Sequence, residues 1–143
     1  MVTTSYAGQT IDVGTVTATN DTQNLYVTYN LKEGWYLTET HVWAGSIDQL
    51  PVNNSDNPVI GSFTYHGYHD STISTYKYTI PLCSLPASGE YYISAHGVVV
   101  KKVNGAVVQK ETMFGYGIDY AGKRWGWYFP YCNTGCSGTI AGL

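Results

Sequence analysis

Two glutamates and two histidines stand where they could act together. Glu39 and His41 are two residues apart and share one face of a strand, because side chains alternate across a strand with a period of two. His96 and Glu111 occupy two further strand-like segments joined by a turn. The four groups could ligate a divalent metal, supply a general base or contact a polar ligand. The interpretation we favour is a hydrogen-bonded structural cluster at the edge of the core.

The elements that must position these side chains are strands. Runs of β-branched and aromatic residues are divided by Gly, Pro, Asn and Asp, and no window has the periodicity of an amphipathic helix. The pattern predicts an antiparallel β-sandwich of roughly eight strands, a single domain over residues 1–143 with an N-terminal extension (1–9) and a C-terminal tail (132–143). The expected strands are Thr10–Thr19, Asn24–Tyr29, Trp35–Trp43, Ile60–Tyr65, Thr72–Ile80, Tyr91–Val103, Ala106–Met113 and Trp125–Phe129.

The firmest local prediction is a two-residue hairpin turn at Asn104-Gly105, since both turn residues must adopt positive φ. Such a turn places Val103 opposite Ala106 and sets the pairing of the whole hairpin. Continued without interruption, it pairs Val99 with Lys110, Val98 with Glu111 and His96 with Met113. Glu111 is then expected diagonally beside His96 on one face. In the expected strand Trp35–Trp43, the alternation of side chains predicts a common face for Leu37, Glu39, His41 and Trp43.

Aromatic residues are abundant and charged residues are scarce. The chain has 14 Tyr and 4 Trp, and only 12% of its residues are charged, against about 25% in an ordinary domain. Its net charge of −3, with no long basic run, argues against nucleic-acid binding, and no apolar stretch predicts membrane insertion. Tyr and Trp suit half-exposed surfaces that bind a ligand. The candidate ligand contacts are Trp35, Tyr36, Trp43, Trp125, Trp127 and Tyr128.

Three further patterns bear on metals and disulfides. His66 and His69 could hold a metal, but a solvated turn is the interpretation we favour, so no metal site is predicted. Calcium is the one cofactor considered, in the oxygen-rich loop Val52–Pro58, where an ordinary turn is the simpler interpretation. Cys132 and Cys136 could close a small disulfide loop or remain reduced, which leaves the third cysteine, Cys83, unpaired.

Several segments together resemble a known family. They are Gly34–Trp43, Tyr92–His96 with Glu111-Thr112 after the hairpin, Asn57-Pro58 with Gly61-x-Phe63-x-Tyr65, and Trp125–Phe129. This set resembles an uncharacterised β-rich domain that recurs in secreted and surface proteins of bacteria, and the likeness covers residues 10–131. The resemblance implies an extracellular setting and a non-catalytic β module, and it names no ligand.

The function expected from the sequence is that of a non-catalytic binding module of a secreted or cell-surface protein, with a glycan as its partner. The aromatic surplus and the low charge motivate this expectation. The alternative is a structural or adhesive subunit that self-associates in a bacterial surface layer or filament, because Thr- and Tyr-rich strands also suit sheet packing. An enzyme that uses Glu39, His41, His96 and Glu111 ranks third.

Overall fold

The computed structural model describes residues 1–134, which form ten antiparallel strands and three short 3₁₀ turns, with no α-helix in that range. This confirms the prediction of an all-β antiparallel fold. The strands are β1 (Val2–Ala7), β2 (Ile11–Asn20), β3 (Asn24–Leu31), β4 (Trp35–Gly45), β5 (Tyr65–Tyr68), β6 (Thr75–Pro81), β7 (Glu90–Val103), β8 (Ala106–Gly115), β9 (Ile118–Asp119) and β10 (Trp127–Cys132). The turns are η1 (Ile47–Gln49), η2 (Ile60–Ser62) and η3 (Leu82–Ser84).

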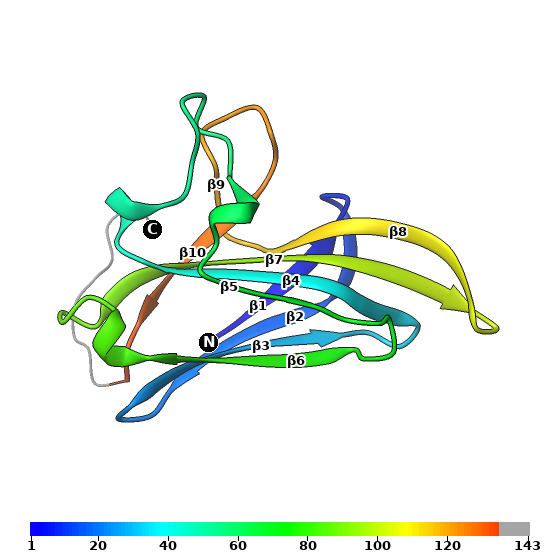
Figure 1. Cartoon of the computed structure of the whole chain (residues 1–143), viewed down its shortest axis with the longest axis horizontal. Coiled ribbons are helices and arrows are strands. Elements are labelled where there is room, and N and C mark those ends of the chain that lie inside the picture. Colours follow the sequence, from blue (N-terminus) through cyan, green and yellow to red (C-terminus); the bar gives the residue numbers. More distant parts are fainter. Residues whose placement is uncertain (135–143) are drawn as a thin grey trace.

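The strands form one strongly curved sheet that nearly closes on itself (Figure 1). Its order is β5-β4-β7-β8-β1-β2-β3-β6, and β10 pairs with the first part of β7, beside β8. The chain between β5 and β6 bridges the two ends of this order. There the Leu37 amide donates to Ile73 O at 2.8 Å, and the Leu31 amide donates to Ser74 O at 2.8 Å. The sheet therefore encloses a core in the manner of a barrel.

The concave side of the sheet holds the main hydrophobic core. Alternate residues of each strand point inward, as the period of two requires. Val16 of β2, Leu25 of β3, Ile93 of β7 and Met113 of β8 are fully buried there, together with Phe129 of β10. Burial of such side chains is worth about 1.5–3 kcal/mol each before the cost of ordering the chain. The opposite, outer face of the same strands is therefore the face available to other groups.

Two segments differ from the strand pattern expected from the sequence. Val2–Ala7, expected as an extension, is strand β1 and lies between β8 and β2. Ile60–Tyr65, expected as a strand, begins with the turn η2, and pairing with β4 starts only at Tyr65. Both differences have the same physical cause, since pairing partners distant in the sequence decide whether a short β-branched segment becomes a strand.

The hairpin turn is confirmed. Asn104 and Gly105 have φ of 51° and 78°, and Val103 pairs with Ala106. Two residues in the left-handed region give the hairpin a twist that matches its strands. The hairpin extends well beyond the neighbouring strands (Figure 1).

Two loops stand together on the outer face of the sheet (Figure 1). The first covers residues 46–64, between β4 and β5, and the second covers residues 116–126, between β8 and β10. Under them lies a second, smaller hydrophobic cluster, built on the buried side chains of Trp43, Phe63 and Tyr92. Because the loops are long and apolar on their underside, they cover part of the sheet that would otherwise be exposed.

Candidate ligand-binding face

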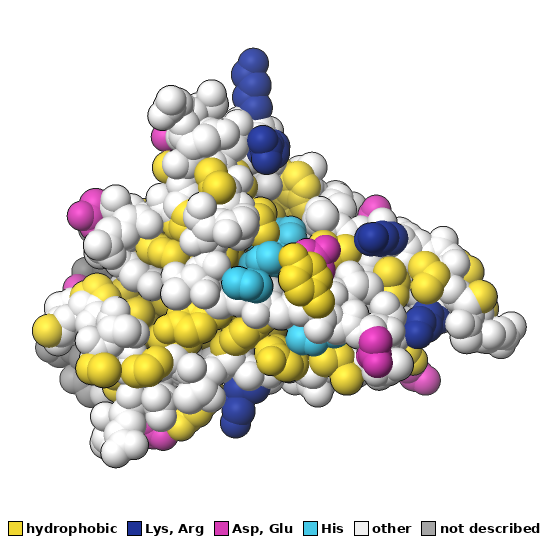
Figure 2. Space-filling view, viewed as in Figure 1, with side chains coloured by type: hydrophobic (Ala, Val, Ile, Leu, Met, Phe, Trp, Pro, Cys, Tyr) yellow, Lys and Arg dark blue, Asp and Glu magenta, His cyan; other side chains and the backbone are white. Residues whose placement is uncertain are grey.

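A row of rings crosses five neighbouring strands on the outer face. Tyr6 of β1 pairs with Phe114 of β8, Phe114 with His96 of β7, His96 with His41 of β4, and His41 with His66 of β5. The ring centroids are 5.0 Å apart for Phe114–His96, 5.5 Å for His96–His41 and 6.0 Å for His41–His66. The histidines gather in the middle of the view in Figure 2. Cross-strand register alone assembles this row from residues far apart in the sequence.

The predicted pair of Glu39 and His41 is confirmed. His41 Nε2 lies 3.2 Å from Glu39 Oε1, and the His41 side chain is buried. Tyr68, opposite Glu39 on β5, presents its ring edge-on to His41 at 6.4 Å. A carboxylate and an imidazole that satisfy each other at the rim of the covered region form the structural pair that we favoured from the sequence.

Glu111 does not join this cluster, contrary to the prediction. The register of the hairpin shifts between Lys101 and Lys102, because Val108 is an extra residue in β8. Beyond this bulge the observed pairs are Val99–Glu111, Val98–Thr112 and His96–Phe114. A shift of one residue moves a side chain to the other face of the sheet, and Glu111 therefore lies on the face opposite His96.

A second bulge affects the face expected for β4. Its register with β7 shifts between Leu37 and Glu39. Leu37 therefore points into the main core, whereas Glu39, His41 and Trp43 keep the common outer face that the alternation predicted. The bulge explains how a leucine and a glutamate two residues apart occupy opposite faces.

His96 is a neutral, buried group with unused hydrogen-bonding capacity. The residue is only 6% exposed, and its pKa is lowered from 6.5 to about 3 by desolvation and, to a smaller extent, by the neighbouring His41. Its Nδ1 is buried and has no hydrogen-bond partner among residues 1–134. An unsatisfied buried polar atom costs about 1–3 kcal/mol, so this nitrogen calls for an explanation.

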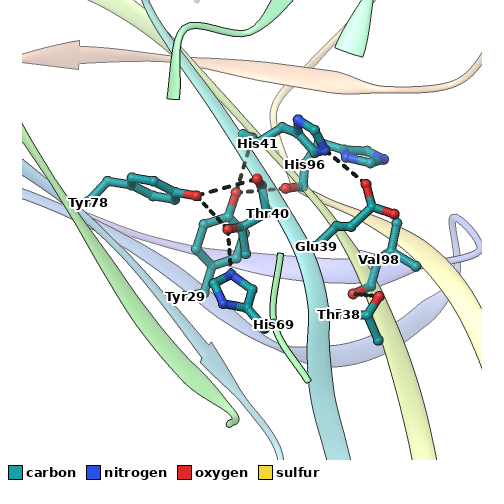
Figure 3. Close-up of polar contacts among 9 residues, drawn as sticks. All are labelled: Tyr29, Thr38, Glu39, Thr40, His41, His69, Tyr78, His96 and Val98. Atoms are coloured by element: carbon teal, nitrogen blue, oxygen red, sulfur yellow. Dashed lines mark hydrogen bonds and ion pairs between the residues drawn. The ribbon is translucent and has the colours of Figure 1, made fainter. Parts of the chain in front are cut away.

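The inner face of the same strands carries a different polar group. Thr40 Oγ1 lies 2.6 Å from the Tyr78 hydroxyl and 2.9 Å from His69 Nε2 (Figure 3). The buried Tyr29 hydroxyl donates to His96 O at 2.7 Å, with His41 O at 3.1 Å. These contacts tie β3 and β6 across the interior to β4 and β7. In Figure 3 they lie on the side of β4 opposite Glu39 and the His41 ring.

His66 and His69 diverge and do not form a shared site. The exposed His66 stacks near His41, while His69 bonds to Thr40, and burial lowers the pKa of His69. Within residues 1–134, no group of three or more His, Cys, Asp or Glu side chains is placed to hold a metal ion. The oxygen-rich loop is organised as a turn, in which Asn53 Oδ1 accepts from the amides of Ser55 and Asn57.

A hollow of about 190 Å³ opens between the sheet and the two loops. Its floor is formed by His96, Thr112 and Phe114 from the sheet. Its walls come from both loops: Pro58 and Ile60 from the first, Arg124 and Trp125 from the second. A concave site with apolar walls and a few polar groups is the common form of a small-molecule site.

The two loops are fastened to each other, which fixes the shape of the hollow. Asn57 Oδ1 accepts from the Arg124 amide at 2.8 Å, and Asp56 O accepts from the Gly122 amide at 3.0 Å. A Cβ atom at Gly122 would overlap Asn57 Oδ1, so only glycine allows this close approach. The second loop is also tied to the sheet, because Ser94 Oγ accepts from the Tyr120 hydroxyl at 2.8 Å.

Next to the hollow, four rings pack edge to face in a cluster that we call the aromatic shelf: Tyr6, Tyr116, Trp125 and Trp127. Trp127 is at its centre, with centroids 5.3 Å from Trp125, 5.1 Å from Tyr116 and 5.9 Å from Tyr6. Trp127 Nε1 donates to Asp119 Oδ1 at 2.7 Å, which fixes the indole. Trp125 and Trp127 are half-buried and Tyr116 is 54% exposed, so the shelf offers ring surface to solvent.

The other predicted ligand contacts lie elsewhere. Trp35 and Trp43 are only 6% and 5% exposed, and their burial removes them as ligand contacts. Tyr128 packs in the smaller cluster against Tyr92. Tyr36 is half-buried under the Lys102 ammonium, 5.0 Å from its ring, and pairs with Val100 outside the row.

Sequence reasoning did not single out Tyr6 or Arg124 for this face. Tyr6 belongs to a strand that was expected as an extension, and Arg124 reaches the hollow only through the pairing of the loops. Of the cysteines, Cys83 is free and exposed; the sequence left open whether Cys132 and Cys136 form a disulfide, and Cys136 lies outside the described residues.

Comparison with protein family models, with characterised sequences and with solved structures finds no match to this chain. Within the described residues, no helix has the length and apolar character needed to cross a bilayer.

Proposed function

We propose that the protein is a non-catalytic carbohydrate-binding module that acts outside the cell, in a secreted or cell-surface protein. The observation that carries the proposal is the aromatic shelf, whose half-exposed tryptophans lie beside the hollow. A pyranose ring presents C–H groups on one face, and an indole offers a complementary apolar surface of similar width. The proposed site is the shelf together with the hollow.

The rigidity of the shelf supports this proposal. Trp127 is held by its bond to Asp119, and the loop that carries Trp125 is bonded to the other loop through Asn57. Rings that are already ordered lose little conformational freedom when a ligand binds, and preorganisation raises affinity by reducing that cost. The low charge of the whole chain suits a partner that is recognised through rings and hydroxyl groups.

A glycan array, followed by calorimetry with the strongest ligand, tests the proposal. Trp125→Ala and Trp127→Ala should each weaken binding by about 1–3 kcal/mol, because each removes one stacked ring. Tyr36→Ala is the matched control: it removes a half-buried ring outside the shelf and should leave affinity unchanged. Unfolding curves of all three variants show whether each still folds.

The proposal fails if no glycan binds, or if the Tyr36 variant loses as much affinity as the shelf variants. Light scattering over a range of concentrations distinguishes it from self-association, the alternative function. An apparent molecular mass that increases with protein concentration, in a protein that binds no glycan, would favour the alternative.

A further inference from the structure

We propose that the hollow binds an acidic sugar, with the sugar carboxylate on Arg124 and a sugar hydroxyl on His96. This inference rests on the proposed function and specifies its ligand class: a hexuronic acid unit of a glycan. Three observations support it: a cation at the rim without an ion pair in residues 1–134, a buried histidine nitrogen without a hydrogen-bond partner there, and two aromatic rings that meet at a corner.

Of the described residues that line the hollow, Arg124 is the one with a permanent charge. It is exposed, and no ion pair within residues 1–134 involves its guanidinium group. Its backbone is nevertheless fixed by the bond to Asn57. A guanidinium group binds a carboxylate through two parallel hydrogen bonds, which adds geometric selectivity for a planar acid. A carboxylate is therefore the complementary ligand group at this rim.

His96 supplies a neutral polar group in the floor of the same hollow. Its ring is packed edge-on against Phe114 with centroids 5.0 Å apart, and its Nδ1 has no hydrogen-bond partner in the described part of the chain. A neutral imidazole can donate through one nitrogen and accept through the other, which suits a hydroxyl group. Thr112 is a second polar residue of the floor. The floor therefore favours a polyhydroxylated ligand over a simple organic acid.

The hollow also has an aromatic lining, formed by Trp125 of the wall and Phe114 of the floor. Trp125 and Phe114 have centroids 5.3 Å apart at an interplanar angle of 73°, so they form a corner. One ring of a sugar can lie against this corner, and the hollow of about 190 Å³ suits a single sugar unit. The shelf continues from Trp125 to Trp127, so the next unit of the chain can lie on the next ring. An inorganic anion would use Arg124 and leave the wall and the floor without contacts.

Calorimetry with matched glycosides tests the inference directly. Methyl β-D-glucuronide and methyl β-D-glucoside differ only in a carboxylate at C6, and the galacturonide and galactoside form a second pair. We expect the acid of at least one pair to bind the wild-type protein about tenfold more tightly than its neutral partner at low salt. Arg124→Gln should abolish this preference, so that the acid binds no more tightly than its neutral partner.

Two further variants complete the test. Lys123→Gln is the matched control, because it removes a neighbouring exposed cation that does not line the hollow, and the preference should persist. Trp125→Ala should weaken the acid and the neutral glycoside alike. If wild-type protein binds both members of each pair equally, or Lys123→Gln removes the preference as fully as Arg124→Gln, the inference is wrong while the proposed function stands. If no glycoside or array glycan binds, both are wrong.

Discussion

The two faces of the β4–β7 strand pair differ in the hydrogen bonding of their polar side chains. On the inner face, the hydroxyls of Tyr29, Thr40 and Tyr78 all have hydrogen-bond partners, and they connect opposite walls of the barrel. On the outer face, Glu39 and His41 pair with each other, whereas His96 Nδ1 has no hydrogen-bond partner among residues 1–134. The same two strands thus carry a hydrogen-bonded network of hydroxyl groups on the inner face and an unpaired ring nitrogen on the outer face. The comparison teaches that the inner hydroxyl groups are satisfied by the fold itself, whereas one buried nitrogen on the outer face is not.

The largest expected difference between the two faces is in how much folding stability is lost when the pH falls. His96 stays neutral in the folded state because its pKa falls from 6.5 to about 3. Between these values the unfolded chain binds a proton that the folded protein does not, so stability falls as pH falls below 6.5. At about 1.4 kcal/mol per pH unit, the loss reaches about 3 kcal/mol by pH 4.

Denaturant unfolding of His96→Leu between pH 7 and pH 4 measures this effect. The variant should lose less stability on acidification than the wild-type protein does. His69→Leu, on the inner face, provides the comparison, because burial also lowers the pKa of His69 but leaves this histidine partly exposed. Its effect on the pH dependence should be in the same direction and smaller. Parallel profiles of wild-type protein and His96→Leu would contradict our description of the outer face.

The inner network should show its role as a loss of stability at neutral pH. Tyr29→Phe removes the hydroxyl that donates to His96 O and lies near His41 O. We expect a loss of about 1–2 kcal/mol in the free energy of unfolding, because a buried hydrogen bond is lost and its acceptors remain. Glycan affinity should not change. A variant of full stability with weakened binding would reverse the roles that we give to the two faces.

How far the sequence could predict this arrangement depends on the range of the interactions. The turn at Asn104-Gly105 was predictable because it depends on two adjacent residues that tolerate positive φ. The position of Glu111 was not, because the bulge at Val108 depends on how β8 fits its neighbours. Strand β1 was missed for a similar reason, since its central place comes from pairing with β8 and β2.

Among the aromatic residues, too, the features set by local sequence were predictable and those set by distant segments were not. Composition predicted a ring-rich surface, and the half-exposed Trp125 and Trp127 belong to the predicted set. Alternation could not reveal that Trp43 lies under a loop or that Trp35 is in the main core, because both depend on segments distant in the sequence. The pair Glu39–His41 was predictable, since both side chains leave one strand on one face.

The most direct test of the central claim is an NMR titration of the four tryptophan indole N–H signals with the best array glycan. The chain supplies its own control, because Trp125 and Trp127 are half-buried on the shelf while Trp35 and Trp43 are buried. We predict that the signals of Trp125 and Trp127 shift with glycan concentration and that those of Trp35 and Trp43 stay in place. Equal shifts of all four, or shifts confined to the buried pair, would contradict the account.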